Sequence, residues 1–339
     1  MENLAATPIA YTKKMGIIKI PRDLAAVVSK KRLPTAWGSH SLRLFYHADH
    51  CLAIIVDAEK KTVKYFHQGS HKFIRQSQIG WTPSSRMRHA WTENQFLSID
   101  QDSFQIVIAR YPTLTEVQRL DSEQYISLEV IPDDRVIVAG GRFKNLRAFN
   151  LKTFESEEIN VKDAANIQEI RYLKGASQLI ISPEHRAELL IYDWKNKAVS
   201  QRVKPFTAVI ELLKFDFFNE NTMLTWCYND SELQIWKREG PTSPFKITRK
   251  VDKEKESMDQ VQVIPESPYF LIRKRSNHSL QLLTTDSRMA PLLKIFKQVQ
   301  PMSCFAYDPR KGSVICAGEY YGVRVIYFRD FIAKESTFV

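Results

Sequence analysis

A pattern of four residues, in which an apolar residue and any residue precede two apolar or aromatic residues, recurs seven times along the chain. The copies start 41 to 47 residues apart, with a mean spacing of about 43. A period of this length indicates a repeated unit that buries its apolar face only against its neighbours. The copies are VKYF (63–66), FQIV (104–107), LRAF (146–149), LLIY (189–192), LQIW (233–236), LQLL (280–283) and VRVI (323–326).

The surroundings of each copy predict strands. Two apolar runs precede the first copy, LRLFYH (42–47) and CLAIIVD (51–57), and a more polar run, HKFIRQS (71–77), follows it. Turn residues such as the PDD of 132–134 separate runs of this kind throughout the chain. Short runs bounded by turn residues are typical of β-strands. Each copy therefore predicts a unit of four antiparallel strands, whose outermost strand is the most polar.

The predicted fold is all-β, a seven-bladed β-propeller of four-stranded blades. The seventh copy has no clear fourth strand after it, whereas residues 12–21 near the N-terminus read TKKMGIIKIP, a lone strand. We expect residues 13–21 to be the outer strand of blade 7, closing the ring by pairing with the last blade. The expected organisation is an N-terminal tail over 1–12, a propeller over 13–329 and a C-terminal tail over 330–339.

The seven copies, their period and the predicted closure resemble the WD40-repeat family of seven-bladed propellers over about residues 13–328. Family blades carry Trp-Asp at the end of the third strand, and here only Asp193 keeps that Asp, with Asn150 as a near match. In the preceding turn the family Asp is matched by Asp230 and Asn277. The resemblance implies that apolar packing replaces most of the family's hydrogen-bond network. The family Trp position holds Phe66, Val107, Phe149, Tyr192, Trp236, Leu283 and Ile326.

The sequence carries no motif for catalysis, metal binding or cofactor binding. It has no Gly-rich phosphate loop, no G-x-S-x-G and no H-E-x-x-H. Its eight histidines lie in segments that belong to opposite faces of the predicted disc, so they do not converge on one site. We therefore expect a protein that is not an enzyme, with no catalytic residues, no metal, no cofactor and no small-molecule substrate.

Charge gives the main indication of a partner. The chain has a net charge of +11, which favours acidic partners. In a propeller, the loops between blades and the turns from second to third strands share one face, and several basic segments fall on it. The candidate partner-binding residues there are Lys30, Lys31, Arg32, Arg75, Trp81, Arg86, Arg88, His89, Arg142, Lys144, Arg273, Lys274 and Arg275.

Three interpretations of this basic face remain open. Trp and Arg are enriched in protein hot spots, which favours a protein-interaction scaffold, a subunit of a larger assembly that docks an acidic or phosphorylated segment. The same residue types contact phosphates and stack on bases, so the alternative is an RNA-contacting component of a ribonucleoprotein. The third is a solvated face without a partner.

The remaining expectations concern location. The N-terminus shows no secretion signal, and the apolar runs are too short to span a bilayer. The four cysteines lie within apolar runs, which is typical of buried free thiols in a reducing compartment. We expect an intracellular protein, cytoplasmic or nuclear, without membrane insertion.

Overall fold

The structure is a computed structural model. It describes residues 42–47, 52–57, 61–67, 72–83, 90–91, 95–110, 113–120, 124–133, 136–141, 146–161, 164, 166–184, 186–206, 213–227, 232–252, 258–274, 280–285, 293–294, 302–308, 313–318 and 322–327. Within these residues every regular element is a β-strand. The predicted closing strand (13–21) and both predicted tails lie outside them, so these expectations stay predictions.

The described strands form seven antiparallel sheets. Sheet 1 contains β1 (Leu42–His47), β2 (Leu52–Asp57), β3 (Thr62–His67) and β4 (Lys72–Gln78). Sheet 2 contains β5 (Ala90–Trp91), β6 (Gln95–Ile99), β7 (Ile106–Arg110) and β8 (Thr115–Leu120). Sheet 3 contains β9 (Tyr125–Ile131), β10 (Val136–Gly141), β11 (Leu146–Asn150) and β12 (Ser156–Ile159). Sheet 4 contains β13 (Ile167–Leu173), β14 (Gln178–Pro183), β15 (Leu189–Asp193) and β16 (Ala198–Val203).

The other three sheets follow the same order. Sheet 5 contains β17 (Leu213–Asn219), β18 (Thr222–Cys227), β19 (Glu232–Lys237) and β20 (Lys246–Asp252). Sheet 6 contains β21 (Met258–Val263), β22 (Tyr269–Lys274), β23 (Leu280–Thr284) and β24 (Leu293–Lys294). Sheet 7 contains β25 (Met302–Asp308), β26 (Ser313–Gly318) and β27 (Gly322–Tyr327). Six copies of the repeated pattern lie within a third strand, as predicted, and the second copy (104–107) begins two residues before its third strand, β7.

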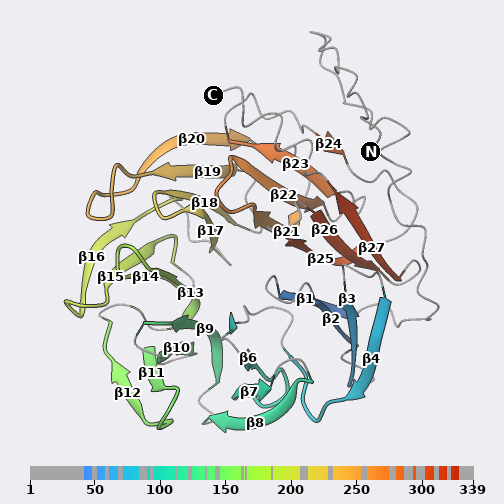
Figure 1. Cartoon of the computed structure of the whole chain (residues 1–339). Helices are drawn as coiled ribbons and strands as arrows, with labels where there is room; N and C mark the ends of the chain where they lie inside the picture. The colour runs from blue at the N-terminus through green and yellow to red at the C-terminus, as the bar shows by residue number, and fades with distance from the viewer. Residues whose placement is uncertain are drawn as a thin grey trace, which may run out of the picture.

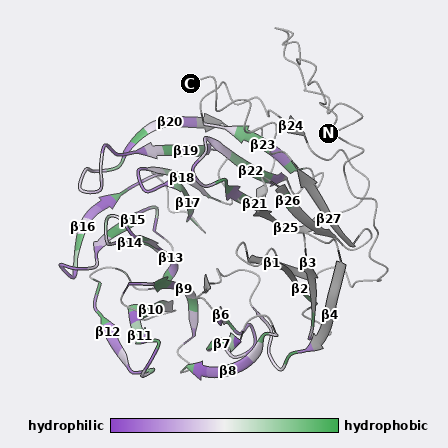
Figure 2. Cartoon of the chain, viewed as in Figure 1, coloured by the Kyte–Doolittle hydropathy of each residue, from purple (hydrophilic) through white to green (hydrophobic). Residues whose placement is uncertain are grey.

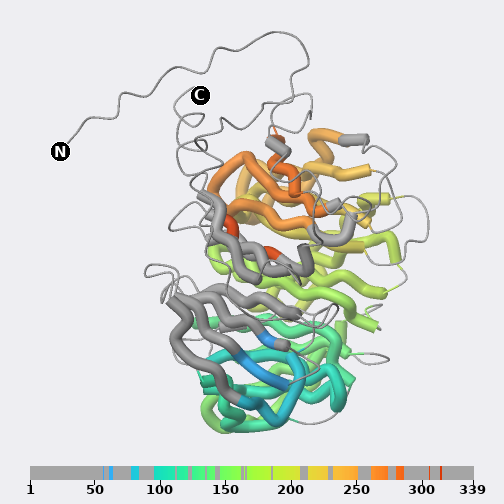
Figure 3. Tube along the Cα trace, turned by 90° about the vertical axis from the view of Figure 1, so that its right-hand side faces the viewer, coloured from blue at the N-terminus to red at the C-terminus, as the bar shows by residue number. Residues whose placement is uncertain are grey.

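The sheets follow one another around a central axis, and the predicted propeller architecture is confirmed. The first strand of each sheet lies near the axis and the fourth lies at the rim (Figure 1), and the side view shows the strands crossing the thickness of the disc (Figure 3). Strand β1 of the first sheet packs against β25 of the last. The two ends of the described chain are thus neighbours in the ring.

The core consists of apolar layers between neighbouring sheets. A separate buried cluster lies between each adjacent pair from sheet 1 to sheet 6. All six residues of β14 are buried, whereas β16, the outer strand of the same sheet, alternates between exposed and partly buried residues. Hydropathy follows this gradient, and β16 is largely hydrophilic at the rim (Figure 2). The middle strands are apolar on both faces because both faces are covered.

Gly140 marks the closest approach between sheets 3 and 4. A Cβ at this position would lie 2.5 Å from Cγ2 of Ile167 and 3.2 Å from Cδ1 of Ile170. Ile167 and Ile170 are fully buried, so they have little room to move. Only glycine allows β10 and β13 to pack this closely.

We expect Gly140→Ala to destabilise the protein by about 1–3 kcal/mol, because the added methyl group overpacks this layer. Urea unfolding monitored by tryptophan fluorescence measures the change. Gly80→Ala is the matched control, since a Cβ there meets no atom within 4 Å. Equal stability of Gly140→Ala and wild type would show that sheets 3 and 4 move apart without cost.

Four outer strands share an irregularity in their pairing with the third strand. One residue is left unpaired at the same point of sheets 1, 2, 4 and 5, at Ile74, Val117, Ser200 and Thr248. In two of these β-bulges a hydroxyl group bonds the facing backbone. Ser200 Oγ donates to the Ile191 carbonyl at 3.1 Å and Thr248 Oγ1 donates to the Ile235 carbonyl at 3.2 Å. The bulge is therefore a feature of the repeat.

Candidate interaction face

Contacts between turns define two faces of the disc. Lys61, in the turn from β2 to β3, lies 3.3 Å from Asp102, in the turn from β6 to β7. Lys174 and Asp133, in the turns from first to second strands of sheets 4 and 3, lie 3.1 Å apart. Turns of one kind meet each other because the sheets share one orientation. We call the face with the second-to-third turns the upper face, and the opposite one the lower face.

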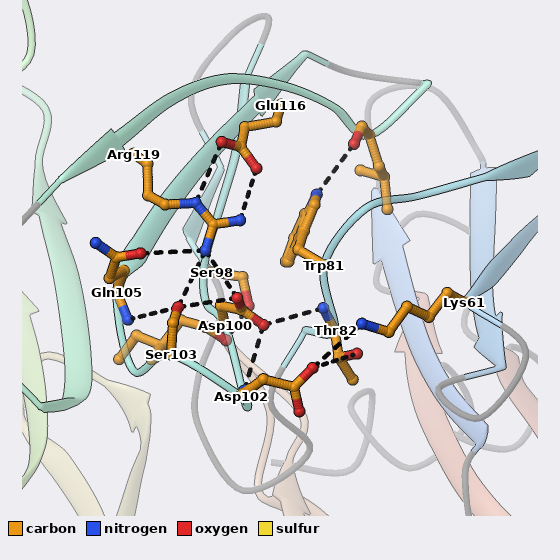
Figure 4. Close-up of polar contacts among 12 residues, drawn as sticks. Lys61, Trp81, Thr82, Ser98, Asp100, Asp102, Ser103, Gln105, Glu116 and Arg119 are labelled. Atoms are coloured by element: carbon orange, nitrogen blue, oxygen red, sulfur yellow. Dashed lines mark hydrogen bonds and ion pairs between the residues drawn. The ribbon is translucent and has the colours of Figure 1, made fainter. Parts of the chain in front are cut away.

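A buried carboxylate organises the upper face between sheets 1 and 2. Asp100 immediately follows β6, and its side chain is 6% exposed. Its Oδ1 accepts hydrogen bonds from the backbone N–H groups of Thr82 (3.1 Å) and Asp102 (3.3 Å). Its Oδ2 accepts from Ser103 Oγ (2.9 Å) and Arg119 Nη1 (2.8 Å). Asp100 thereby joins three parts of the chain, which are the segment at Thr82, its own turn and the outer strand β8 (Figure 4).

Arg119 of β8 lies between two carboxylates. Its Nη2 donates to Glu116 Oε2 at 2.7 Å and its Nε donates to Glu116 Oε1 at 3.2 Å, a bidentate pair. Its Nη1, besides the bond to Asp100, donates to Ser103 Oγ at 3.0 Å and to Gln105 Oε1 at 3.2 Å. The guanidinium of Arg119 is thus used within the protein and acts as a structural group.

The network shifts the pKa values of both charged partners. Burial alone would raise the pKa of Asp100, but hydrogen bonds from Arg119, the Thr82 N–H and Ser103 outweigh burial and hold it below its ordinary value of 3.8. The hydrogen bond to Glu116 is the main cause that raises the pKa of Arg119, and Asp100 adds to it. Both groups are therefore charged at neutral pH, and each stabilises the charge of the other.

The predicted exposure of Trp81 is wrong. Trp81 is 1% exposed and packs in the layer between sheets 1 and 2, with its ring centroid 6.2 Å from that of Phe96. Its Nε1 donates to the Leu114 carbonyl at 3.3 Å. Its ring is therefore not available to stack on a base or to fill a partner's pocket. In the sequence, the apolar residues Ile79 and Trp81 alternate with Gly80, and this alternation indicates that Trp81 is buried.

The segment 75–91, which holds the candidate Arg75, begins and ends in strands. Arg75 lies within β4 opposite Tyr65, Pro83 pairs with Asp100 in an isolated bridge, and β5 covers the last two residues. Arg75 therefore belongs to the rim strand of sheet 1 and not to a loop of the upper face.

The structure locates two further candidate residues at the end of a strand. Arg273 is half-buried in β22, and Lys274 is the last residue of that strand, before the segment that leads to β23. The other candidates lie outside the described residues, and their role stays a prediction. They are Lys30, Lys31, Arg32, Arg86, Arg88, His89, Arg142, Lys144 and Arg275.

The sequence reading missed Asp100, although a shared turn points to it. The segments DQDSFQ (100–105), NLKTFE (150–155) and DWKNKA (193–198) each begin with Asp or Asn. In each, the first side chain accepts backbone N–H bonds from inside the turn. The fifth residue, Phe104, Phe154 or Lys197, has a positive φ. The same type of turn therefore occurs on both the upper and the lower face of the disc.

A second charged cluster lies on the inner strands of sheets 4 and 5. Glu169 of β13 contacts Arg171 at 3.0 Å and Lys214 of β17 at 3.2 Å. Arg171 Nε lies 3.9 Å from Asp216, whose Oδ2 accepts a bond from the Val263 N–H of sheet 6 at 3.4 Å. The cluster contains two cations and two carboxylates. It links three consecutive inner strands and leaves no excess charge of either sign.

The described residues lack the features of a metal site and of a membrane-spanning helix. No group of three or more His, Cys, Asp or Glu side chains is arranged there to hold a metal ion. No helix among these residues is long and apolar enough to cross a membrane. Cys227 of β18 is buried, in agreement with the expectation for this residue.

Comparison with known proteins identifies the fold. No protein-family model and no curated protein sequence matches the chain. Among solved structures it is similar to the Cps50 (Swd1) β-propeller domain of Myceliophteria thermophila, with a TM-score of 0.68 and 11% identity over 88% of this chain and 98% of that one. It is also similar to U3-55K, with a TM-score of 0.67 and 10% identity over 90% of this chain and 99% of that one.

Proposed function

We propose that this chain, which has the fold of the WD40-like β-propellers, is a non-catalytic interaction scaffold within a larger assembly. Its upper face docks an acidic or phosphorylated segment of a partner protein. The fold supports this proposal because it offers a broad rigid face whose turns vary without disturbing the core. Fold by itself does not determine function, so the proposal depends on the charges of that face.

The sequence feature that carries the proposal is a set of basic segments that we assign to the upper face. Asp100 and Asp102 contact Arg119 and Lys61 within the protein, so these carboxylates do not offset other cations. Four further segments assigned to this face contain Lys and Arg without a single Asp or Glu. An acidic segment would meet a surface of opposite charge there. These segments are KKR (30–32), SSRMRH (84–89), RFKN (142–145) and RKRSNH (273–278).

The test removes four of these charges together, in a variant with Arg86, Arg88, Arg142 and Lys144 all replaced by alanine. We expect its affinity for a twelve-residue Asp/Glu peptide to fall at least tenfold, because each contact to a charged group contributes about 1.5–3 kcal/mol. Fluorescence anisotropy with the labelled peptide, and with a phosphoserine peptide, measures the affinity.

The matched control removes two charges from the lower face, Lys152→Ala and Lys195→Ala. Both side chains are exposed, and both lie in turns from third to fourth strands. The control is expected to bind within twofold of wild type. If both variants weakened peptide binding equally, the effect would come from net charge and not from the upper face. Unchanged binding by the four-residue variant would contradict the proposal.

The alternative partner is RNA, which the net charge of +11 favours. Neutralisation of phosphates releases counterions, so the logarithm of an RNA affinity falls linearly with the logarithm of salt concentration. The RNA alternative would be favoured if a single-stranded RNA bound more tightly than both peptides. The slope of its log affinity against log salt concentration should then be smaller in the four-residue variant.

A further inference from the structure

A groove runs along the rim between sheets 3 and 4, away from the upper face. Strand β12 has four residues and ends at Ile159, whereas its neighbour β16 has six and continues to Val203. The two outer strands lie at the rim of neighbouring sheets (Figure 1). The groove has a volume of about 570 Å³. This volume falls within the range of ligand sites, about 300–1,000 Å³.

The wall of the groove is built mainly by one strand. Residues 198–202 of β16 are five consecutive lining residues, joined by Lys197 at one end, by Asn160 and Val161 at the edge of sheet 3, and by Tyr192. The Ser200 bulge interrupts the regular backbone ladder of β16 at the middle of the groove. A bound segment would therefore be recognised by side chains more than by an added strand pairing.

The charges of the lining are all of one sign. Lys197 lies at one end of the groove and Arg202 at the other, and the lining contains no carboxylate. Between them lie Asn160, Ser200 and Gln201, with the apolar Val161 and Val199. The side chains of Ser200 and Gln201 are already used within the protein, since Ser200 Oγ donates to the Ile191 carbonyl and the Gln201 amide bonds the backbone of Phe245, the residue before β20 of sheet 5. Four residues (198–201) separate the two cations, a span of about 16 Å.

Both cations have internal contacts that a ligand can share or exchange. Lys197 Nζ lies 3.7 Å from the Trp194 ring centroid and 3.9 Å from Glu157, a pair whose side chains are 51% and 69% exposed. Exposed pairs of this kind contribute about 0–1 kcal/mol. Arg202 Nη1 lies 3.2 Å from Glu188 with its side chain 37% exposed. A guanidinium has five donors, so Arg202 can bind a second carboxylate.

We propose that this groove binds an extended acidic segment of a partner protein, with one carboxylate at Lys197 and a second at Arg202. The segment lies along β16 with three residues between its two acidic residues, because side chains four residues apart on an extended segment share one face and span about 13 Å. Its central residues contact Val161 and Val199, which line the groove. The site is separate from the upper face, and the proposal shares with the proposed function only the need for a protein partner.

The probe is a fluorescent octapeptide of Ser, Thr and Val with Glu at positions 2 and 6, which share one face of an extended chain. We expect it to bind the full chain at least tenfold more tightly than a peptide with Gln at both positions. A third peptide, with Glu at positions 4 and 5, has the same charge and the wrong spacing. It is expected to bind about tenfold more weakly, because one carboxylate cannot reach a cation.

The variants Lys197→Glu and Arg202→Gln are each expected to weaken binding of the first peptide about tenfold. Lys246→Glu, on the rim strand β20 of sheet 5, is the matched control for charge and exposure, and it is expected to bind like wild type. Equal affinity for the two Glu peptides, or equal loss in the Lys246 variant, would overturn the proposal.

The four-residue alanine variant of the upper face separates this proposal from the previous one. Binding of the octapeptide is expected to persist in that variant, because none of its substitutions lies at the groove. Loss of octapeptide binding in the upper-face variant, with none in the groove variants, would place the octapeptide on the upper face and contradict the groove site.

Discussion

Deletion of residues 1–21 is expected to leave the protein unfolded or aggregated. The described part of sheet 7 has three strands and ends at β27, whereas every other sheet has four, and we predict that residues 13–21 supply the fourth. About four ladder hydrogen bonds at about 1 kcal/mol net each add to partial burial of three or four large apolar side chains, at about 1.5–3 kcal/mol when complete. The sum of roughly 5–10 kcal/mol is comparable to the whole stability of a typical domain.

Deletion of residues 1–10 is the control, and it is expected to have little effect, because the predicted strand begins at residue 13. Circular dichroism and size-exclusion chromatography on the two shortened chains distinguish the outcomes. A well-folded monomer that lacks residues 1–21 would show that the predicted closure is wrong, and the fourth strand of sheet 7 would then have to come from elsewhere.

Substitution of Asp100 is expected to have the second-largest effect. Asp100→Ala removes the acceptor of four hydrogen bonds and leaves the Nη1 group of Arg119 without its carboxylate, at a cost of about 3–5 kcal/mol in unfolding free energy. Asp100→Asn keeps the shape and one carbonyl oxygen, so we expect it to cost less. Urea unfolding at pH 7 measures both. Asp102→Asn is the control on the same turn, because its side chain is 59% exposed and its ion pair contributes about 0–1 kcal/mol.

The effect of Asp100 depends on pH with a defined sign. Its pKa in the folded protein lies below the ordinary value of 3.8, so folding favours the charged form. The stabilisation is complete above the pKa of the unfolded chain and is lost as the pH falls through the folded pKa. The stability difference between wild type and Asp100→Asn is therefore expected to be constant from pH 7 to about pH 5 and to shrink below pH 4. A difference that does not change down to pH 3 would show that the charge of Asp100 is not involved.

The fold could be predicted from the sequence because a repeated pattern is a local property. The third strands with Phe149, Tyr192 and Trp236 recur at nearly constant spacing, and each needs only its own neighbours to form a sheet. Even the few residues that match the Trp-Asp signature have a structural role. Asp193 accepts backbone N–H bonds from Lys195 and Asn196 at 2.9 Å each, and Asn150 makes the same kind of turn.

The upper face could be predicted only in outline because its contacts join distant segments. Asp100 and Arg119 belong to one sheet but are 19 residues apart, and Lys61 reaches Asp102 from the preceding sheet across 41 residues. A count of charges along the sequence does not show that Arg119 is paired with both Glu116 and Asp100. The burial of Trp81 depends on the layer between two sheets, which a single segment does not reveal.

The bulges of the outer strands have a consequence for a protein that works beside many others. A flat strand edge at the rim would offer a neighbouring copy a ready place to extend the sheet, which is a common route to aggregation. In sheets 1, 2, 4 and 5 the extra residue at the middle of the outer strand twists that edge and interrupts its row of donors and acceptors. In these four sheets the bulge therefore makes the rim a poorer template for pairing with another copy of the chain.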